Sequence, residues 1–348
     1  GTAVMPTSLS TILRPYIKKT NEDLAQLLSS KKPEKLFQYV AYQLGLVNDK
    51  FEPLKEPKGG KRLRASIPLM TAKYIGDGEF SSSIAMALEL FHNFTLIIDD
   101  IQDNDATRRG RSTLWKIIGI PQALNAALIA EALSFECARN ACVHLSPRTA
   151  MKWYESFQEM TQRVFEGQHL DILYEKQEVV YTAQYLQMAR AKTACLLSTS
   201  FSCGFALQAK EELRNLAPQM KQVGESAGMA FQIQDDILGL WGDPKKTGKS
   251  VGSDLVRHKK TLPISYAMEN GSNSTKKLIQ EAYSKEISQK DAESLLSCLE
   301  VVGAKEYAMS QVREYTSKAL SLLASIPTDE KLKKSLGELI EGLVYRES

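Results

Sequence analysis

Residues 81–103 read SSSIAMALELFHNFTLIIDDIQD, a mostly apolar run that ends in three aspartates. A run that is apolar on most sides over more than twenty positions predicts a helix in the middle of a bundle. On that helix Asp99 and Asp103 lie four residues apart and share a face. Like charges at this spacing destabilise a helix, so the pair predicts a cationic partner. A hard divalent cation suits such oxygen ligands.

The rest of the chain is also patterned as helices, in three- and four-residue steps. Strand-like alternation is scarce, and Glu178–Tyr181 is the nearest candidate. We expect helix stops at Gly76, Gly78, Pro121, Pro147 and Pro218. The predicted helices cover residues 8–29, 33–46, 61–76, 81–103, 121–145, 147–176, 181–208, 209–240, 255–270, 274–283, 287–301, 304–325 and 328–345.

The fold class that follows is all-α, a single large helical bundle spanning residues 1–348. No linker-like stretch divides the chain, so one domain is favoured over two. Residues 1–30 are expected to hold an N-terminal helix. The polar, glycine-rich segment 242–254, GDPKKTGKSVGSD, is expected to be a mobile loop.

Composition narrows the class of protein. The 44 basic and 41 acidic residues give a net charge of +3, which does not favour a nucleic-acid partner. The five cysteines form no CxxC pair, so they indicate buried thiols in a reducing compartment. The sequence has no run of about eighteen apolar residues, so no membrane span is expected. The opening GTAVMPTS does not resemble a secretory signal, so we expect a cytoplasmic protein.

A second acidic pair, Asp235 and Asp236, lies inside the apolar stretch FQIQDDIL at residues 231–238. Two such clusters can face each other across a cavity in a helical bundle. Either cluster alone could be a solvated acidic turn, whereas the two together favour a metal site. Because histidine and cysteine do not adjoin the pairs, magnesium is favoured over zinc or iron.

Basic residues follow both clusters. Arg108 and Arg109 come after the first, Lys249 and Lys259 after the second, and GGKRLR at residues 59–64 opens a helix. Any one of these could be a solvated charged face. Together they predict a phosphate-bearing substrate, because Mg²⁺ commonly joins carboxylates to phosphates and helix N-termini favour anions.

These motifs, in this order, resemble the trans-prenyl diphosphate synthase family from about Gly59 to the end of the chain. GGKRLR is similar to its isopentenyl diphosphate motif, and DDIQDNDATRRG to its first aspartate-rich motif. GQHLDI, Lys192-Thr193, FQIQDDILGLWGD and GKSVGSD follow the family order. The resemblance implies the isoprenoid synthase fold, a bundle around a deep central cavity with the 242–254 loop over the site. It also implies a homodimer that condenses an allylic diphosphate with isopentenyl diphosphate, using three Mg²⁺ ions bound with the diphosphate.

The resemblance also implies roles for particular residues. The metal ligands would be Asp99, Asp103 and Asp235, supported by Asp100 and Asp236. Isopentenyl diphosphate would be held by Lys61, Arg64, His92 and Arg109. The allylic diphosphate would be held by Arg108, Lys192, Thr193, Gln232, Lys249 and Lys259. The ionisation step would depend on Asp99, Asp103, Arg108, Lys192, Asp235 and Lys249.

Three positions depart from the family pattern. Gly239 stands where many members carry a third aspartate, which implies fewer direct metal ligands with activity retained. Residues 125–128, NAAL, lack a common Gly-Asp step, which leaves the detail of the cavity near Ala127 open. Ala65 replaces a common proline after the basic motif.

Product length is expected to depend on the residues below Asp99. Thr95 lies one turn below, Phe94 flanks it and Phe91 lies about a turn deeper. Either ring could floor the tunnel, or could be simple core packing. The resemblance implies a farnesyl or geranylgeranyl product, with geranylgeranyl favoured. The alternatives are a terpene cyclase on the same fold, a non-catalytic subunit and a helical scaffold with acidic patches. Retention of Lys61, Arg64, His92 and Arg109, and of both acidic clusters, argues against them.

Overall fold

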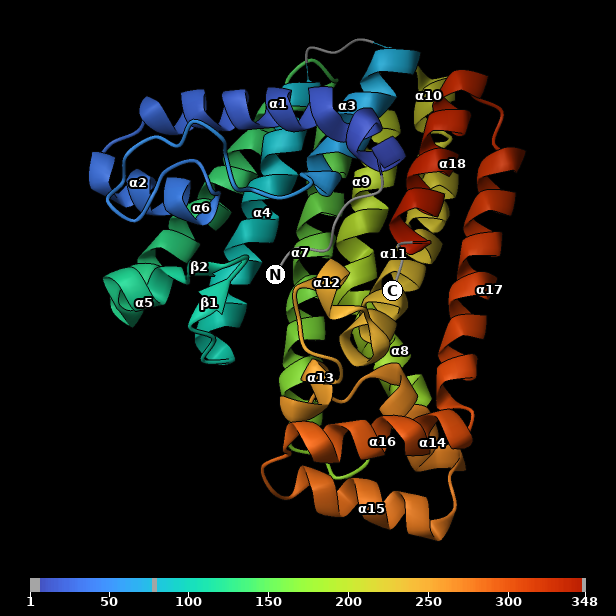
Figure 1. The fold of residues 1–348 in the computed structure, drawn as a ribbon. Coiled ribbons are helices and arrows are strands. Elements are labelled where there is room, and N and C mark those ends of the chain that lie inside the picture. The colour runs from blue at the N-terminus through green and yellow to red at the C-terminus, as the bar shows by residue number, and fades with distance from the viewer. Residues whose placement is uncertain (1–6, 77–79, 346–348) are drawn as a thin grey trace.

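The computed structural model describes residues 7–76 and 80–345, and it confirms the all-α prediction (Figure 1). A pair of two-residue strands, β1 (Thr107–Arg108) and β2 (Arg111–Ser112), forms an antiparallel ladder. A five-residue π-helix, η1, covers Arg190–Ala194. The α-helices are α1 (Thr7–Ser29), α2 (Glu34–Gln43), α3 (Leu63–Ile75), α4 (Ser81–Gln102), α5 (Leu114–Ile118), α6 (Ile120–Asn140), α7 (Pro147–Glu175), α8 (Thr182–Ala189), α9 (Cys195–Ala206), α10 (Glu211–Arg214), α11 (Ala217–Trp241), α12 (Pro244–Thr247), α13 (Ser253–Val256), α14 (Leu262–Asn270), α15 (Asn273–Tyr283), α16 (Gln289–Val301), α17 (Ala304–Ser325) and α18 (Glu330–Val344).

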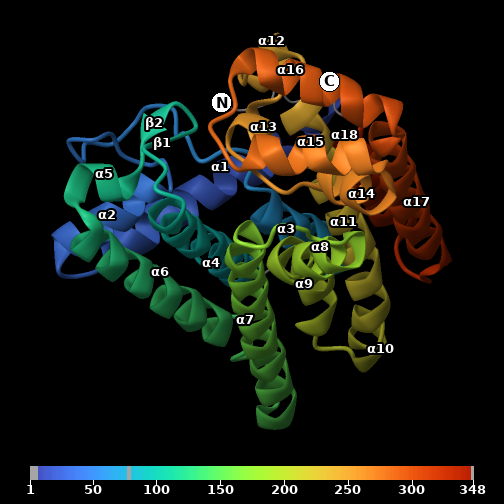
Figure 2. The same cartoon turned by 90° about the horizontal axis from the view of Figure 1, so that it is seen from below.

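Long helices run side by side through the centre of the molecule. α4 packs on α6 and α3, while α11 packs on α9 and α17. Helix α1 lies across one end of this bundle, and α15 and α16 lie across the other (Figure 1). Seen from below, α4, α7, α9 and α11 form the middle, with α6 and α17 on opposite flanks (Figure 2). The helices that carry the two acidic clusters therefore both belong to the central layer.

Helix α4 is a long, apolar helix of the central layer. Among the described residues it alone has the length and mean hydropathy that could cross a membrane. Its 18-residue apolar window is 67% buried inside the bundle, a composition that the central helix of a bundle also requires. Ile84, Leu88 and Phe91 on this helix are fully buried. Burial on most sides thus accounts for the sequence of residues 81–102.

Several helices that were predicted to be continuous are interrupted in the structure. The span 181–208 is interrupted by η1, and 209–240 divides into α10 and α11. The span 255–270 stops at Val256 and resumes at Leu262, with His258 at a φ of +59°. The predicted loop 242–254 contains the short helix α12 and the start of α13. The pair of strands and α5 were not predicted.

The expected helix stops among the described residues lie near helix boundaries. Gly76 ends α3. A helix also ends before each of Pro121, Pro147 and Pro218, and each proline lies in the first turn of the next helix. Proline is tolerated there since its missing N–H would have no intrahelical partner. Gly78, and the part of the predicted N-terminal helix before Thr7, lie outside the described residues.

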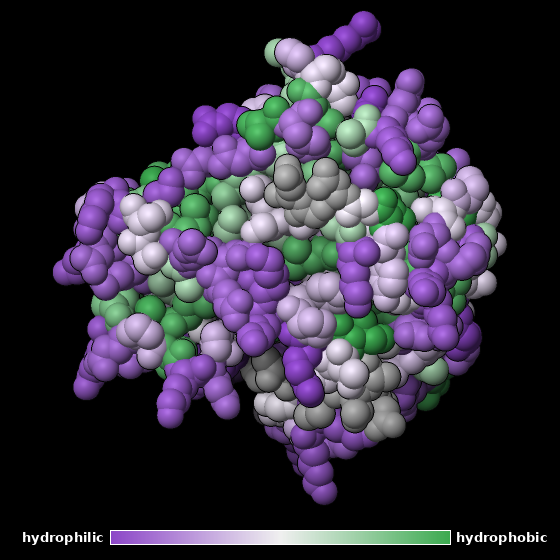
Figure 3. All heavy atoms as spheres, turned by 90° about the horizontal axis from the view of Figure 1, so that it is seen from above, coloured by the Kyte–Doolittle hydropathy of each residue, from purple (hydrophilic) through white to green (hydrophobic). Residues whose placement is uncertain are grey.

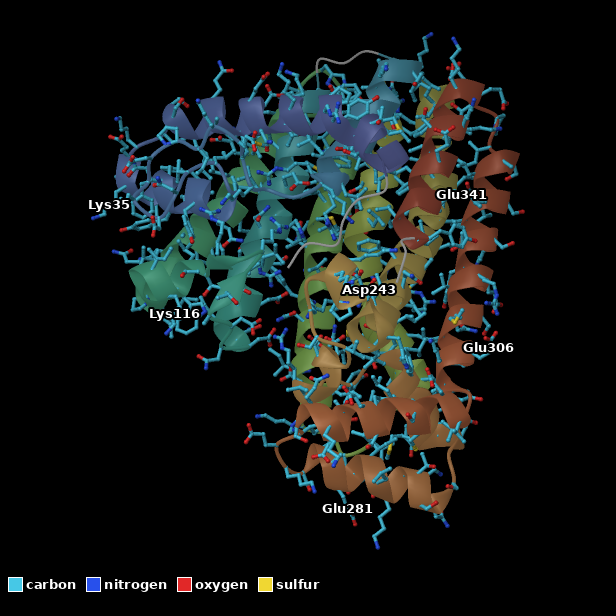
Figure 4. The ribbon with its side chains drawn as sticks, in the orientation of Figure 1. Lys35, Lys116, Asp243, Glu281, Glu306 and Glu341 are labelled. Atoms are coloured by element: carbon cyan, nitrogen blue, oxygen red, sulfur yellow. The ribbon has the colours of Figure 1, made fainter. Side chains whose placement is uncertain are left out.

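The surface seen from above shows hydrophilic side chains over most of the area, with smaller hydrophobic areas between them (Figure 3). The labelled side chains of Lys35, Lys116, Glu281 and Glu306 project from the periphery (Figure 4). All five cysteines are free, and four of them are buried. Burial raises the pKa of the Cys137 thiol to about 12 and raises that of Cys203 as well.

Candidate active site

A cavity of about 480 Å³ opens between the two acidic clusters. Asp99, near the C-terminal end of α4, and Asp235, in the C-terminal part of α11, both line it. The prediction that the clusters share one hollow is therefore confirmed. The polar and charged side chains on its walls are Arg64, His92, Thr95, Asp99, Arg108, Gln168, Lys192, Thr193, Gln232, Asp235, Thr247, Lys249, Asp254 and Lys259.

The structure separates the predicted site residues into two groups. Those on the cavity wall are Arg64, His92, Phe94, Thr95, Asp99, Arg108, Lys192, Thr193, Gln232, Asp235, Lys249 and Lys259. Those outside its lining are Lys61, Phe91, Asp100, Asp103, Arg109 and Asp236. Neighbouring residues on a helix point about 100° apart, and in both DD pairs the first aspartate faces the cavity while the second is buried in protein.

Asp99 is the acid of the first cluster that faces the cavity. Burial raises its pKa, while Lys192 and Arg108 oppose that shift. Lys192 Nζ lies 4.0 Å from Asp99 Oδ2 and 2.5 Å from Asp171 Oδ2. Asp103 caps the end of α4 with its side chain exposed, and its N–H donates to the Asp99 carbonyl at 2.8 Å.

Asp100 holds Arg108 in place. The Arg108 Nε and Nη2 atoms donate to the buried Asp100 carboxylate at 3.0 and 2.8 Å. Burial lowers the pKa of Arg108, but the bonds to Asp100 outweigh that effect and raise it. Arg108 therefore presents a fixed guanidinium to the cavity, and a bidentate pair of this kind is geometrically specific.

Asp236 is likewise turned into protein. It is fully buried, and its carboxylate accepts from the Tyr185 hydroxyl, from Gln232 Nε2 at 3.2 Å and from the Leu262 N–H at 3.2 Å. Burial raises its pKa to about 6. Lys259 Nζ lies 3.8 Å from Asp236 and 4.0 Å from Asp254. Burial lowers the pKa of Lys259, but those two carboxylates reverse the shift and raise it.

Lys192 and Thr193 lie in the π-helix η1. π-helices distort the regular ladder and are frequent at functional sites. Thr193 Oγ1 donates to Gln232 Oε1 at 3.1 Å, which joins η1 to α11. Gly167 of α7 lies against the backbone of Lys192, where a Cβ would collide with it. This close approach needs glycine and sets the distance between α7 and η1.

A second group of cations surrounds His92. Burial lowers the pKa of His92 well below its usual value, and Arg64, Arg109 and Arg108 add to that shift. His92 is therefore neutral at pH 7. Burial also lowers the pKa of Arg109, to about 10, which leaves it charged. Lys61 Nζ stands 5.6 Å from the centroid of the Phe231 ring. This concentration of positive charge forms one side of the site.

Apolar side chains form the wall below Asp99. Phe94 lines the cavity and meets Phe165 edge-on at a centroid distance of 5.7 Å. Phe91 is fully buried behind Phe94 and packs against Phe157 at 6.2 Å. Of the two rings, only Phe94 is exposed to the cavity, as a residue that limits the tail must be. Phe91 packs behind it in the core.

Three carboxylates of the site were not predicted. Asp171 pairs with Lys192 and belongs to GQHLDI, a motif that the sequence offered without a role. Asp254 lines the cavity, and its carboxylate occupies the space where a Cβ at residue 239 would lie. Gly239 therefore makes room for Asp254. Glu89, buried beneath the basic motif, pairs with Arg62 at 3.4 Å, and no sequence signal separated it from a core position.

The carboxylates of the cavity suit Mg²⁺ better than they suit a metal whose ligands all come from the protein. Among residues 7–76 and 80–345, no three His, Cys, Asp or Glu side chains are grouped closely enough to hold a metal. The carboxylates that face the cavity come from three separate elements, α4, α11 and α13. Mg²⁺ binds in this way, through one or two carboxylates with the remaining positions filled by water and phosphate oxygens.

The segment 242–254 lies beside this cavity, to which Thr247, Lys249 and Asp254 contribute. Asp243 accepts from the Lys245 N–H at 3.0 Å and so caps α12, which lies in front of the central helices (Figure 4). Just beyond the segment, Arg257 Nη2 contacts Asp105 Oδ1 at 2.7 Å. This exposed ion pair joins the polypeptide after α13 to the loop that follows the first acidic cluster.

Comparison with known proteins gives a consistent result. Residues 51–300 match the polyprenyl synthetase family. A geranylgeranyl pyrophosphate synthase of Geoglobus acetivorans is 33% identical over 344 residues, covering 97% of this chain and 99% of that protein. A geranylfarnesyl diphosphate synthase of Aeropyrum pernix is 35% identical over 294 residues, covering 83% and 91%. The crystal structure of a polyprenyl synthetase from Streptomyces coelicolor A3(2) has a TM-score of 0.88 at 27% identity, covering 97% and 99%.

Proposed function

The chain belongs to the polyprenyl synthetase family, and from that membership we propose that it is a chain-elongating prenyltransferase. It condenses an allylic diphosphate with isopentenyl diphosphate and releases diphosphate. One observation carries the proposal: carboxylates from α4 and α11 face a single cavity whose walls bear fixed cations and whose lower part is apolar. That arrangement suits a substrate with a charged head and a hydrocarbon tail.

We propose that the enzyme uses Mg²⁺, with three ions bound together with the diphosphate. Asp99 and Asp235 would hold the metal from opposite walls, and Asp103 lies beside Asp99 at the end of α4. When bound, Mg²⁺ would neutralise the diphosphate and stabilise the charge that develops on it as the bond to the allylic carbon breaks.

The cations of the protein contribute to the same step. Lys192, held by Asp171, and Arg108, held by Asp100, present fixed charge to the leaving diphosphate. Fixed charges of this kind need no reorganisation when the bond breaks. Lys249 and Lys259 face the same cavity. Arg64, Arg109 and neutral His92 form the cationic side proposed for isopentenyl diphosphate.

The carbon–carbon bond then forms between two substrates held in line. The double bond of isopentenyl diphosphate attacks the allylic cation, and a proton is lost to the departing diphosphate. A protein base is therefore not required. Leu96, Ile98, Val164 and Leu196 line the cavity. They keep water from the cation, which would otherwise be trapped.

We propose geranylgeranyl diphosphate as the main product, ahead of farnesyl diphosphate. The position of Phe94 on the cavity wall supports a limit to the tail. Relatives include a geranylgeranyl pyrophosphate synthase and a geranylfarnesyl diphosphate synthase. The first name states the product proposed here, and the second states a product one isoprene unit longer.

We also propose a homodimer in the cytoplasm. Ile120, Leu124 and Leu128 recur every four residues on α6 and are 45%, 40% and 60% exposed. A stripe of this kind favours burial against another apolar surface. Free thiols at all five cysteines support a reducing compartment. Light scattering of the intact protein and of Leu128→Glu tests the dimer: the variant should be monomeric.

The test of function is an assay with each allylic starter, with and without labelled isopentenyl diphosphate. The expected result is a longer prenyl diphosphate that forms only when both substrates and Mg²⁺ are present. A chelator should abolish product, and added Mg²⁺ should restore it. Release of a hydrocarbon from one allylic diphosphate, without isopentenyl diphosphate, would refute the proposal and favour a cyclase.

A further inference from the structure

The second aspartate of the α11 cluster is surrounded by protein instead of facing the cavity. One carboxylate oxygen of Asp236 accepts from the Tyr185 hydroxyl and the Leu262 N–H, and the other accepts from Gln232. Lys259 supplies the nearby positive charge at 3.8 Å. A buried carboxylate is stable only when it is paired and hydrogen-bonded in this way.

Two of these partners do reach the cavity. Gln232 and Lys259 both line it, while Asp236 holds each from behind. The bond from Thr193 Oγ1 to Gln232 Oε1 directs the amide nitrogen of Gln232 to Asp236. Both the oxygen and the nitrogen of the Gln232 amide are thereby held. Asp236 thus connects the cavity wall on α11 to the lysine that follows α13.

Tyr185 is the anchor of this network. It lies on α8, is 2% exposed and packs among Ala189, Ile233 and Ile237 of one core cluster. Its ring position is set by that packing, so its hydroxyl is held where the Asp236 carboxylate meets it. Tyr185 itself does not line the cavity.

We propose that Tyr185 is a positioning residue that acts through Asp236 on Gln232 and Lys259, and that Asp236 organises these side chains instead of binding metal directly. The inference rests on the proposed function in one respect, that the cavity binds a diphosphate. Without the Tyr185 hydroxyl, one oxygen of Asp236 keeps only the Leu262 N–H. The carboxylate is then free to turn toward Lys259 and to draw its ammonium away from the diphosphate.

The effect should be confined to the allylic side. Arg108 is held by Asp100, and Lys192 by Asp171, through contacts that do not involve Tyr185. His92 and Arg64, on the side proposed for isopentenyl diphosphate, lie on α4 and α3, whereas Tyr185 lies on α8. Loss of the hydroxyl should therefore weaken binding of one diphosphate and leave the other unchanged.

The test is Tyr185→Phe, with Tyr16→Phe, at a partly buried tyrosine that packs against another core cluster, as the control. Calorimetry measures binding of inorganic diphosphate in the presence of Mg²⁺, and kinetics give KM for each substrate. Because a hydrogen bond to a charged group is stronger than one between neutral groups, its loss in Tyr185→Phe should weaken diphosphate binding and raise the allylic KM by about 5- to 20-fold. KM for isopentenyl diphosphate, and both values in Tyr16→Phe, should stay as in the unmodified enzyme.

Asp236→Asn supplies a second, independent variant. If Asp236 organises the site, this variant weakens diphosphate binding to a similar degree and leaves the Mg²⁺ concentration for half-maximal binding unchanged. A raised Mg²⁺ requirement would overturn the assignment and make Asp236 a metal ligand. Unchanged diphosphate binding in Tyr185→Phe, or equal changes for both substrates, would overturn it too. Because binding is measured directly, an enzyme that binds diphosphate but elongates no chain refutes only the proposed function.

Discussion

Arg62→Met should destabilise the protein although it leaves the cavity lining intact. Arg62 belongs to the basic motif GGKRLR, yet its side chain is fully buried. It donates to Glu89 at 3.4 Å, to Asn21 Oδ1 at 2.9 Å and to the Leu44 carbonyl. Glu89 also accepts from the Ala65 N–H at 3.2 Å. The substitution leaves a buried carboxylate with its backbone donor but without the arginine that pairs with it.

Breaking a buried ion pair by removing one partner costs about 3–5 kcal/mol. An unfolding entropy of about 2.1 cal/mol/K per residue gives about 0.7 kcal/mol/K for a chain of 348 residues. The melting temperature should therefore fall by about 4–7 °C, since a loss of about 3–5 kcal/mol is divided by that entropy. This is a large shift for one residue outside the cavity.

Differential scanning calorimetry of the intact protein measures the shift. The informative control is the double variant Arg62→Met with Glu89→Leu, which removes both charges. Replacement of a buried pair by apolar residues of similar volume is often neutral, so the double variant should recover most of the lost stability. A single variant that melts within 1 °C of the unmodified protein (well below the shift of about 4–7 °C worked out above), or a double variant less stable than the single, would refute the reasoning.

Three further predictions concern the cavity and the core. Phe94→Ala should lengthen the product, because the ring lies on the wall below the acids; chromatography that shows an unchanged chain would count against Phe94 as the floor. Gly239→Ala should lower activity sharply, because a Cβ at this position collides with the Asp254 carboxylate. Gly337→Ala is the control and should keep its activity, because its Cβ makes only an ordinary contact; steady-state assays of both variants check this. Iodoacetamide at pH 8 should label Cys298 in the folded protein and spare the buried cysteines, whose thiol pKa values are raised by burial; peptide mass spectrometry that finds the buried thiols labelled first would contradict it.

The common cavity could be predicted because its signal is local. An apolar helix that ends in carboxylates must place those acids at the edge of a buried layer, and two such helices in one bundle have few other places to meet. Asp99 and Asp235 met this expectation. The basic residues around them followed from the same charge argument.

The partners of the site side chains could not be predicted. They depend on the direction in which each side chain leaves its helix and on neighbours that are distant in the sequence. The sequence treats Asp99 and Asp100 alike, yet adjacent residues on a helix point about 100° apart, and Asp100 faces Arg108. Nothing in the basic motif distinguishes Arg62 from its basic neighbours, yet the fold buries it against Glu89. The break between Val256 and Leu262 is marked only by Pro263, in the first turn of α14, and the predicted helix 255–270 ran through it.

The π-helix at residues 190–194 has a consequence for engineering chimaeric enzymes. A π-turn holds one residue more than an α-turn and so takes up that residue without turning the helix that follows, whereas an insertion or deletion in an α-turn would rotate everything downstream by about 100°. Helix α9 would then present different side chains to α3 and α11, against which it packs. Grafts from shorter or longer relatives should therefore be spliced outside residues 182–206, because inside them a single insertion or deletion alters the core as well as the active site.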